Sequence, residues 1–131
     1  MAERCAIVGI GQTKYSAKRP DVSMAGLVRE AAMRALEDAD MTWKDIEAVV
    51  IGKAPDMFEG LMMPEIYLAD ALGAVGKPMM RVHTAGSVGG STAIVASHLV
   101  HGGVFERVLT VAYEKQSETG GQQCGRSGPR T

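Results

Sequence analysis

The sequence predicts an α/β fold in which a mostly parallel sheet is flanked by helices. Short apolar, β-prone runs alternate along the chain with segments of helical periodicity. This alternation is typical of parallel sheets covered by helices. Of the 131 residues, 46% are hydrophobic and 22% are charged, which is ordinary for a globular protein and excludes a disordered chain. We therefore expect one domain, or part of a larger one.

The apolar runs predict four strands, and we expect the first two to be buried. These runs are Cys5–Ile10, Ala48–Gly52, Met79–His83 and Val108–Tyr113. Gly9 and Gly11 also suggest a dinucleotide-binding turn. That fingerprint needs a third glycine where Lys14 stands, so the first strand does not predict a nucleotide site.

Three segments are predicted to be helices. Ser23 is a good N-cap for the first helix, whose apolar residues recur at helical spacing. Those residues are Met24, Leu27, Val28, Ala31, Ala35, Leu36 and Ala39. Pro64 begins the second helix and Gly73 ends it. The third helix spans Ser91–His101 and is stopped by two glycines. The spacing of Thr42–Asp45 resembles a capping box and predicts a single turn.

Charge and cysteine content exclude several classes of protein. The net charge is −1 and the pI is near 6.3, so no basic surface indicates a nucleic-acid or membrane partner. No apolar run is long enough to span a bilayer, and the N-terminus does not resemble a secretory signal. Cys5 and Cys124 lie far apart and support neither a disulfide framework nor a metal site. We therefore expect a cytoplasmic protein without a bound metal.

The turn before the third predicted helix carries most of the chemical information. Gly89 and Gly90 allow positive φ and a close approach of the backbone, so the strand can turn sharply into the helix. Ser87 is placed at or just before the helix N-terminus, which favours an anion or a nucleophile. Two interpretations stay open: Ser87 is a nucleophile in a ligand cleft, or Ser87 or Ser91 caps the helix. Ala85 occupies the position where a serine-hydrolase elbow needs glycine.

Three motifs give the chain a resemblance to the thiolase superfamily, specifically to its lipid-transfer, sterol-carrier-protein-type branch. The motifs are Val8–Thr13 (VGIGQT), Ser87–Ala93 (SVGGSTA) and Ala112–Ser117 (AYEKQS). They span most of residues 5–118. The resemblance implies that residues 1–118 form the N-terminal part of a thiolase-like domain, as a βαβαβαβ portion of its first half.

In this family the turn begins with a nucleophilic cysteine that takes the acyl group from coenzyme A. A glycine follows three places later and an alanine six places later. Gly90 and Ala93 have this spacing from position 87, so Ser87 stands where the family's cysteine belongs. The resemblance also implies that the backbone of Gly89 and Gly90 lies near the thioester.

A serine at this position needs a general base. A thiol has a pKa near ~8.5, whereas a hydroxyl behaves more like water, near ~15.7. The gap corresponds to roughly 10 kcal/mol, and a helix terminus supplies at most about 2 kcal/mol. His83 is the nearest candidate base in the sequence. His98 and His101 are expected on the surface or near the C-terminal end of the helix dipole.

The resemblance implies an acyl-CoA acyltransferase, of the acetyl-CoA acetyltransferase or lipid-transfer type, acting in lipid or sterol acyl-CoA metabolism. Coenzyme A thioester would be its substrate, with no bound cofactor, and a homodimer or a partner subunit would complete it. Thiolases carry a catalytic histidine and a second cysteine in their second half, so the chain alone is expected to be inactive. A thiolase-like retro-aldolase subunit and a non-catalytic partner-binding module are the alternatives.

Residues 119–131 have no apolar periodicity, and we expect a disordered tail. The family typically continues with an apolar helix after the third motif. A codon string that encodes Gln123–Ser127 also encodes Met-Trp-Ala-Leu in a shifted frame. A change of reading frame near Gly120 would therefore explain the tail and a truncated product.

Overall fold

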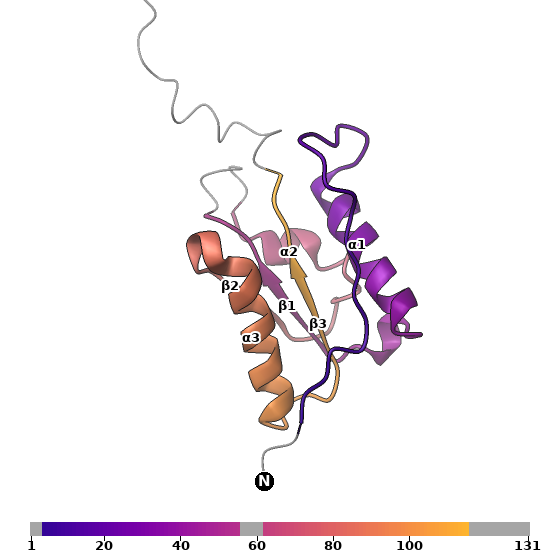
Figure 1. The fold of residues 1–131 in the computed structure, drawn as a ribbon, viewed down its shortest axis with the longest axis vertical. Coiled ribbons are helices and arrows are strands. Elements are labelled where there is room, and N and C mark those ends of the chain that lie inside the picture. The colour runs from indigo at the N-terminus through magenta and orange to yellow at the C-terminus, as the bar shows by residue number, and fades with distance from the viewer. Residues whose placement is uncertain (1–3, 56–61, 116–131) are drawn as a thin grey trace, which may run out of the picture.

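The computed structural model describes residues 4–55 and 62–115 (Figure 1). The predicted tail at 119–131 lies outside these residues. In chain order the elements are α1 (Met24–Asp38), a 3-10 turn (Trp43–Asp45), β1 (Ala48–Gly52), α2 (Pro64–Leu68), β2 (Met79–Val82), a second 3-10 turn (Ala85–Ser87), α3 (Val88–His101) and β3 (Val108–Ala112). No helix in the described part of the chain is both long enough and apolar enough to cross a membrane.

The sheet has three strands in the order β2-β1-β3, and both pairs are parallel. Val49 is opposite Met79 on one side and Leu109 on the other. The predicted parallel α/β arrangement is therefore confirmed. Parallel neighbours also bring the carboxyl ends of all three strands to one edge of the sheet.

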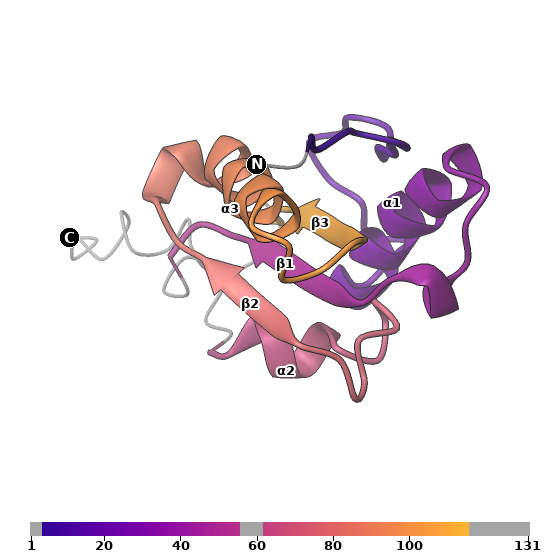
Figure 2. The ribbon, with the colours of Figure 1, turned by 90° about the horizontal axis from the view of Figure 1, so that it is seen from below.

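Helices cover both faces of the sheet. Figure 2 shows α3 on one face and α2 on the other, with α1 beside β3. Alternate strand residues point to opposite faces, so Val49 and Ile51 face α1 and α2 while Gly52 faces α3. The main core cluster comprises Val28, Ala32, Leu36, Ile46, Val49, Ile51, Leu68, Leu72, Ala74, Leu109, Val111 and Tyr113.

The prediction of a buried strand at Cys5–Ile10 was wrong. These residues are extended but pair with no strand among the described residues, and the side chains of Ile7, Val8 and Ile10 are 85%, 61% and 73% exposed. The segment runs along α1 instead, so closely that a Cβ at Gly9 would lie 2.5 Å from the carbonyl oxygen of Ala35. An apolar run forms a buried strand only where a neighbouring strand pairs with it.

The first predicted helix and the single turn are confirmed. The Ser23 hydroxyl accepts a hydrogen bond from the Gly26 N–H at 3.0 Å, and the helix begins at Met24. At the turn, the N–H of Thr42 donates to the Asp45 carboxylate at 2.7 Å, as a capping box does.

The other two helices have different limits from those predicted. α2 is shorter, because its helix ends at Leu68 and turns lead to Gly73. α3 begins at Val88, three residues before the predicted start, because the second 3-10 turn leads directly into it.

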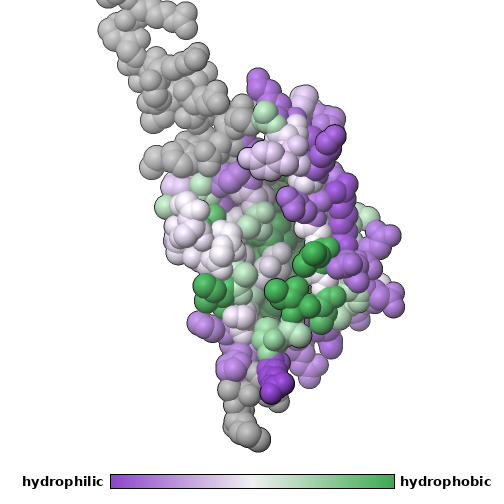
Figure 3. Space-filling model, viewed as in Figure 1, coloured by the Kyte–Doolittle hydropathy of each residue, from purple (hydrophilic) through white to green (hydrophobic). Residues whose placement is uncertain are grey.

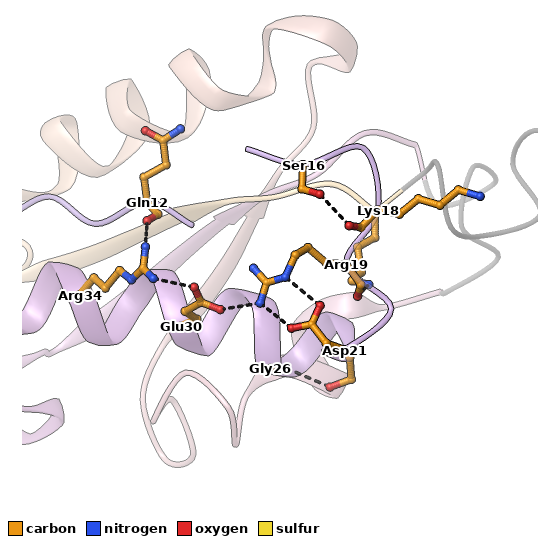
Figure 4. Close-up of polar contacts among 10 residues, drawn as sticks. Gln12, Ser16, Lys18, Arg19, Asp21, Gly26, Glu30 and Arg34 are labelled. Carbon is orange, nitrogen blue, oxygen red and sulfur yellow. Dashed lines mark hydrogen bonds and ion pairs between the residues drawn. The ribbon is translucent and has the colours of Figure 1, made fainter. Parts of the chain in front are cut away.

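Polar contacts hold residues 10–21 against α1 (Figure 4). Arg34 donates to the carbonyl of Gln12 and pairs with Glu30 at 2.8 Å. Arg19 pairs with the same carboxylate at 3.1 Å and with Asp21 at 2.9 Å. The hydrogen bond from Arg19 lowers the pKa of Asp21. Ion pairs and hydrogen bonds therefore hold in place a segment that makes no strand pairing.

Candidate functional site

The carboxyl edge of the sheet carries the polar residues expected of a ligand site in an α/β fold. Lys53 follows β1, His83 follows β2, and Glu114 lies two residues beyond β3. α3 starts at the same edge, because the turn after β2 leads directly into it. The predicted residue Ser87 lies at this start.

Close packing between β1 and α3 fixes the position of the helix start. A Cβ added at Gly52, the last residue of β1, would overlap Oγ1 of Thr92 and lie 3.0 Å from Cγ2 of Val88. The Thr92 hydroxyl is buried and donates to the Val88 carbonyl at 2.6 Å. Glycine at position 52 thus allows the first turn of α3 to rest on the end of β1.

Ser87 occupies the N-cap position of α3, but its side chain makes no capping hydrogen bond. Its hydroxyl donates to the carbonyl of Thr84 at 2.9 Å. Ser91 does not cap the helix either: it lies in the second turn and donates to the Ser87 carbonyl at 3.2 Å. The Thr84 hydroxyl donates to Ser91 Oγ at 2.7 Å, which ties the turn to the helix. The interpretation of either serine as a side-chain cap is therefore wrong.

His83 is exposed, and its Nδ1 accepts a long hydrogen bond of 3.5 Å from the N–H of Ala85. No hydrogen bond joins His83 to Ser87 among the described residues. The Ser87 proton is directed to a backbone carbonyl, not to a base. The hydroxyl is exposed but not activated in this arrangement.

Gly89 and Gly90 allow a positive φ but do not adopt one. Both residues lie in the first turn of α3, and the left-handed residue of the turn is Ala85, with φ of 49°. A non-glycine residue in this region is strained. The two glycines instead leave the helix start uncovered, because a Cβ at Gly90 or at Gly86 would meet nothing within 4 Å.

The remaining predicted histidines lie away from this site. His98 and His101 are exposed and belong to the last turn of α3, as expected. For a helix of 14 residues the two ends are about 20 Å apart. Neither histidine can therefore serve Ser87.

Two polar residues at the carboxyl edge were not predicted. Lys53 is 1% exposed, and its Nζ donates to the carbonyl of Ala54 at 3.4 Å. The carboxylate of Glu114 accepts a hydrogen bond from the N–H of the same residue. Both follow predicted strands closely, so the expectation that ligands bind at the carboxyl ends of parallel strands could have indicated them. The hydrogen bond between Ala54 and Glu114 connects the loops after β1 and β3.

Within the described part of the chain, two cavities beside the sheet are lined by neither Ser87 nor His83. The smaller, of about 300 Å³, lies between residues 12–19 and the end of β3. The larger, of about 810 Å³, lies along the outer edge of β3, and we call it the edge groove. It is lined by residues 4–11, by α1 and by α3, as well as by residues 106–112. Within residues 4–55 and 62–115 no group of three metal-ligating side chains occurs.

Several known proteins are similar to this chain in sequence or in fold. Sterol carrier protein 2 of Bos taurus is 28% identical over 118 residues, which are 88% of this chain and 21% of that protein. The acetyl-CoA acetyltransferase of Methanothermobacter thermautotrophicus is 29% identical over 117 residues, 86% of this chain and 30% of its own. The 3-oxoacyl-[acyl-carrier-protein] synthase III of Aquifex aeolicus superposes with a TM-score of 0.64 at 19% identity, over 75% of this chain and 32% of that structure.

The chain therefore spans about a fifth to a third of the length of the proteins that it matches. No family model matches the sequence. Both the sequence relatives and the structural neighbour are thiolase-like proteins, and the three-stranded parallel sheet with its helices corresponds to part of that fold.

Proposed function

This chain belongs to the thiolase superfamily, and we propose that the start of α3 receives the thioester end of an acyl-CoA in a thiolase-like, lipid-metabolising protein. The observation that carries the proposal is the geometry of Ser87. Its side chain leaves the helix start uncapped, next to open space at Gly86 and Gly90. The N-terminus of a helix favours a polarised oxygen, such as that of a thioester carbonyl.

Ser87 takes part as a polar contact and not as the acyl-accepting group. Losing the hydroxyl proton costs roughly 10 kcal/mol more than losing a thiol proton, and the helix dipole offsets at most about 2 kcal/mol. The hydroxyl already donates to Thr84, which leaves its lone pairs free to accept a hydrogen bond from the substrate. The site can bind a thioester without forming an acyl-enzyme.

The same observation favours a second function, that of a thiolase-like retro-aldolase subunit. In such a reaction a base removes a hydroxyl proton and the C–C bond breaks. The products are a carbonyl compound and a thioester carbanion that takes up a proton. This sequence of steps needs no nucleophile at position 87. The base would come from a partner subunit, in a cytoplasmic homodimer or complex that binds no further cofactor.

The test is a titration of the ¹⁵N-labelled chain with acetyl-CoA, followed by amide chemical shifts. Binding at the proposed site shifts Gly86, Gly89 and Gly90 and leaves Gly102 unchanged at the other end of α3. Gly90→Leu fills the open space and abolishes these shifts, while Gly90→Ala retains them and controls for the loss of glycine. Unchanged shifts at all three glycines under saturating acetyl-CoA would refute the proposal.

A further inference from the structure

A closed ring of hydrogen bonds holds the turn between β2 and α3. The Thr84 hydroxyl donates to Ser91 Oγ at 2.7 Å, and the Ser91 hydroxyl donates to the Ser87 carbonyl at 3.2 Å. The Ser87 hydroxyl closes the ring by donating to the Thr84 carbonyl at 2.9 Å. Each of these hydroxyl protons is therefore directed to another member of the set, and we call Thr84, Ser87 and Ser91 the hydroxyl ring.

Hydrogen bonds, and not packing, fix this turn. Residues 83–87 are exposed. In Figure 3 pale residues of intermediate hydropathy lie at the start of α3, and the green apolar residues lie farther along the helix and beside it. Ala85, with φ of 49°, is strained, and such strain persists only where surrounding interactions hold it. The hydroxyl ring supplies those interactions, together with the Ser87 N–H, which donates to the Thr84 carbonyl at 3.2 Å.

The turn also sets the backbone conformation of Ser87. A serine that caps a helix has an extended backbone, which aims its hydroxyl at the N–H groups of the first turn. Ser23 caps α1 in this way, with ψ of 167°. Ser87 has the same position before α3, but its ψ is 7° and its hydroxyl points back to the turn. The hydroxyl ring thus holds Ser87 in a conformation that withholds its side chain from the helix.

The N–H groups that a capping serine would occupy are those beside the open space at the helix start. A capping side chain accepts from the N–H of the second or third helical residue. In α3 these residues are Gly89 and Gly90, and a Cβ at Gly90 would meet nothing within 4 Å. If Ser87 capped α3, its hydroxyl would compete with a thioester oxygen for the same donors.

We propose that Thr84 is a positioning residue, which acts through the hydroxyl ring to keep Ser87 from capping α3 and so keeps the helix start open to its ligand. Thr84 itself does not touch the ligand. Without the Thr84 hydroxyl, relief of the strain at Ala85 lets the turn relax, and Ser87 caps α3 as Ser23 caps α1. The role of Thr84 in ligand binding rests on the proposed function, whereas its effect on Ser87 does not.

Amide hydrogen exchange of the whole chain, without ligand, tests the effect on Ser87. Thr84→Val removes the hydroxyl at nearly constant shape and should slow exchange at Gly89 or Gly90 about five-fold, the protection that an ordinary serine cap gives. Thr84→Ser keeps the hydroxyl and should exchange like the unchanged chain. The double variant Thr84→Val with Ser87→Ala cannot form the cap and should exchange quickly again, while Gly102 reports in every variant that α3 is intact. Equal exchange in all variants, or slow exchange that persists in the double variant, would overturn the proposal.

Titration of the same variants with acetyl-CoA tests the effect on the ligand. Thr84→Val should weaken binding about five-fold where Ser87 is present, and should change nothing in the background of Ser87→Ala. A loss of the same size in both backgrounds would show that Thr84 only stabilises the turn, and would contradict the proposal. If the unchanged chain binds no acetyl-CoA, the proposed function fails, and the exchange measurement still decides whether Thr84 controls Ser87.

Discussion

Gly52 of β1 and Thr92 of α3 lie so close together that a Cβ at position 52 would overlap the Thr92 hydroxyl. This contact sets the distance between α3 and the sheet. Since Ser87 and the open space beside it belong to the start of α3, the geometry of the site depends on a glycine in a neighbouring strand.

Gly52→Ala should therefore destabilise the fold, by about 1–3 kcal/mol, because the buried Thr92 and Val88 cannot move away freely. Gly90→Ala is the matched control. It adds the same methyl group where nothing lies within 4 Å, and it should stabilise α3 by about 0.5 kcal/mol. Urea unfolding of both variants measures the difference. Equal stabilities would show that β1 does not limit the position of α3.

Two serines at helix starts should respond differently to replacement by alanine. Ser23→Ala should cost about 1 kcal/mol, because the hydroxyl of Ser23 caps α1. Ser87→Ala should change stability by less than about 0.5 kcal/mol, because the exposed hydroxyl of Ser87 donates only to the Thr84 carbonyl. The free energy of unfolding of each variant gives the comparison. If Ser87→Ala lowered the free energy of unfolding as much as Ser23→Ala does, the hydroxyl of Ser87 would be shown to cap α3.

Acid should weaken the hydrogen bonds that join the loop before β1 to the loop before β3. N–H groups of Arg107, at 2.9 Å, and Glu106, at 2.6 Å, donate to the Glu47 carboxylate and lower its pKa. A carboxyl whose pKa is lower in the folded than in the unfolded state stabilises the fold at every pH above its unfolded-state pKa. This stabilisation is lost as the pH falls through the folded-state pKa. Stability should therefore decline below about pH 4.

Urea unfolding between about pH 3 and pH 7 measures this dependence. Glu47→Gln should flatten the profile. Glu37→Gln, which changes a carboxylate without a partner among the described residues, should leave it as it is. A profile that is the same in Glu47→Gln as in the unchanged chain would show that this carboxylate does not govern the acid response.

Local signals in the sequence were sufficient to predict much of the fold. The N-cap at Ser23, the box at Thr42–Asp45 and the buried run Ala48–Gly52 each depend on neighbouring residues or on strong apolar character, and each is present as predicted. The position of Ser87 just before α3 was also predictable, because the polar turn follows a short strand directly, whereas the helix begins three residues before the predicted Ser91.

Features that depend on distant contacts were not predictable in this way. The run Cys5–Ile10 looks as apolar as β1, but burial requires a partner strand that the described residues do not supply. The positive φ lies at Ala85 and not at the glycines, because the 3-10 turn positions the chain before α3 begins. Lys53 is 1% exposed, although a lysine in a loop is ordinarily exposed.

Acetyl transfer to position 87 tests most directly the claim that the start of α3 receives a thioester but that Ser87 is not its nucleophile. The chain, Ser87→Cys and the control Ser91→Cys are incubated with acetyl-CoA and mapped by mass spectrometry, with the exposed Cys5 as an internal reference. We predict acetylation at position 87 only in Ser87→Cys, about ten-fold faster than at Cys5 or in Ser91→Cys, because the helix start favours the thiolate. Acetylation of Ser87 in the unchanged chain, or equal rates at all three cysteines, would contradict this account.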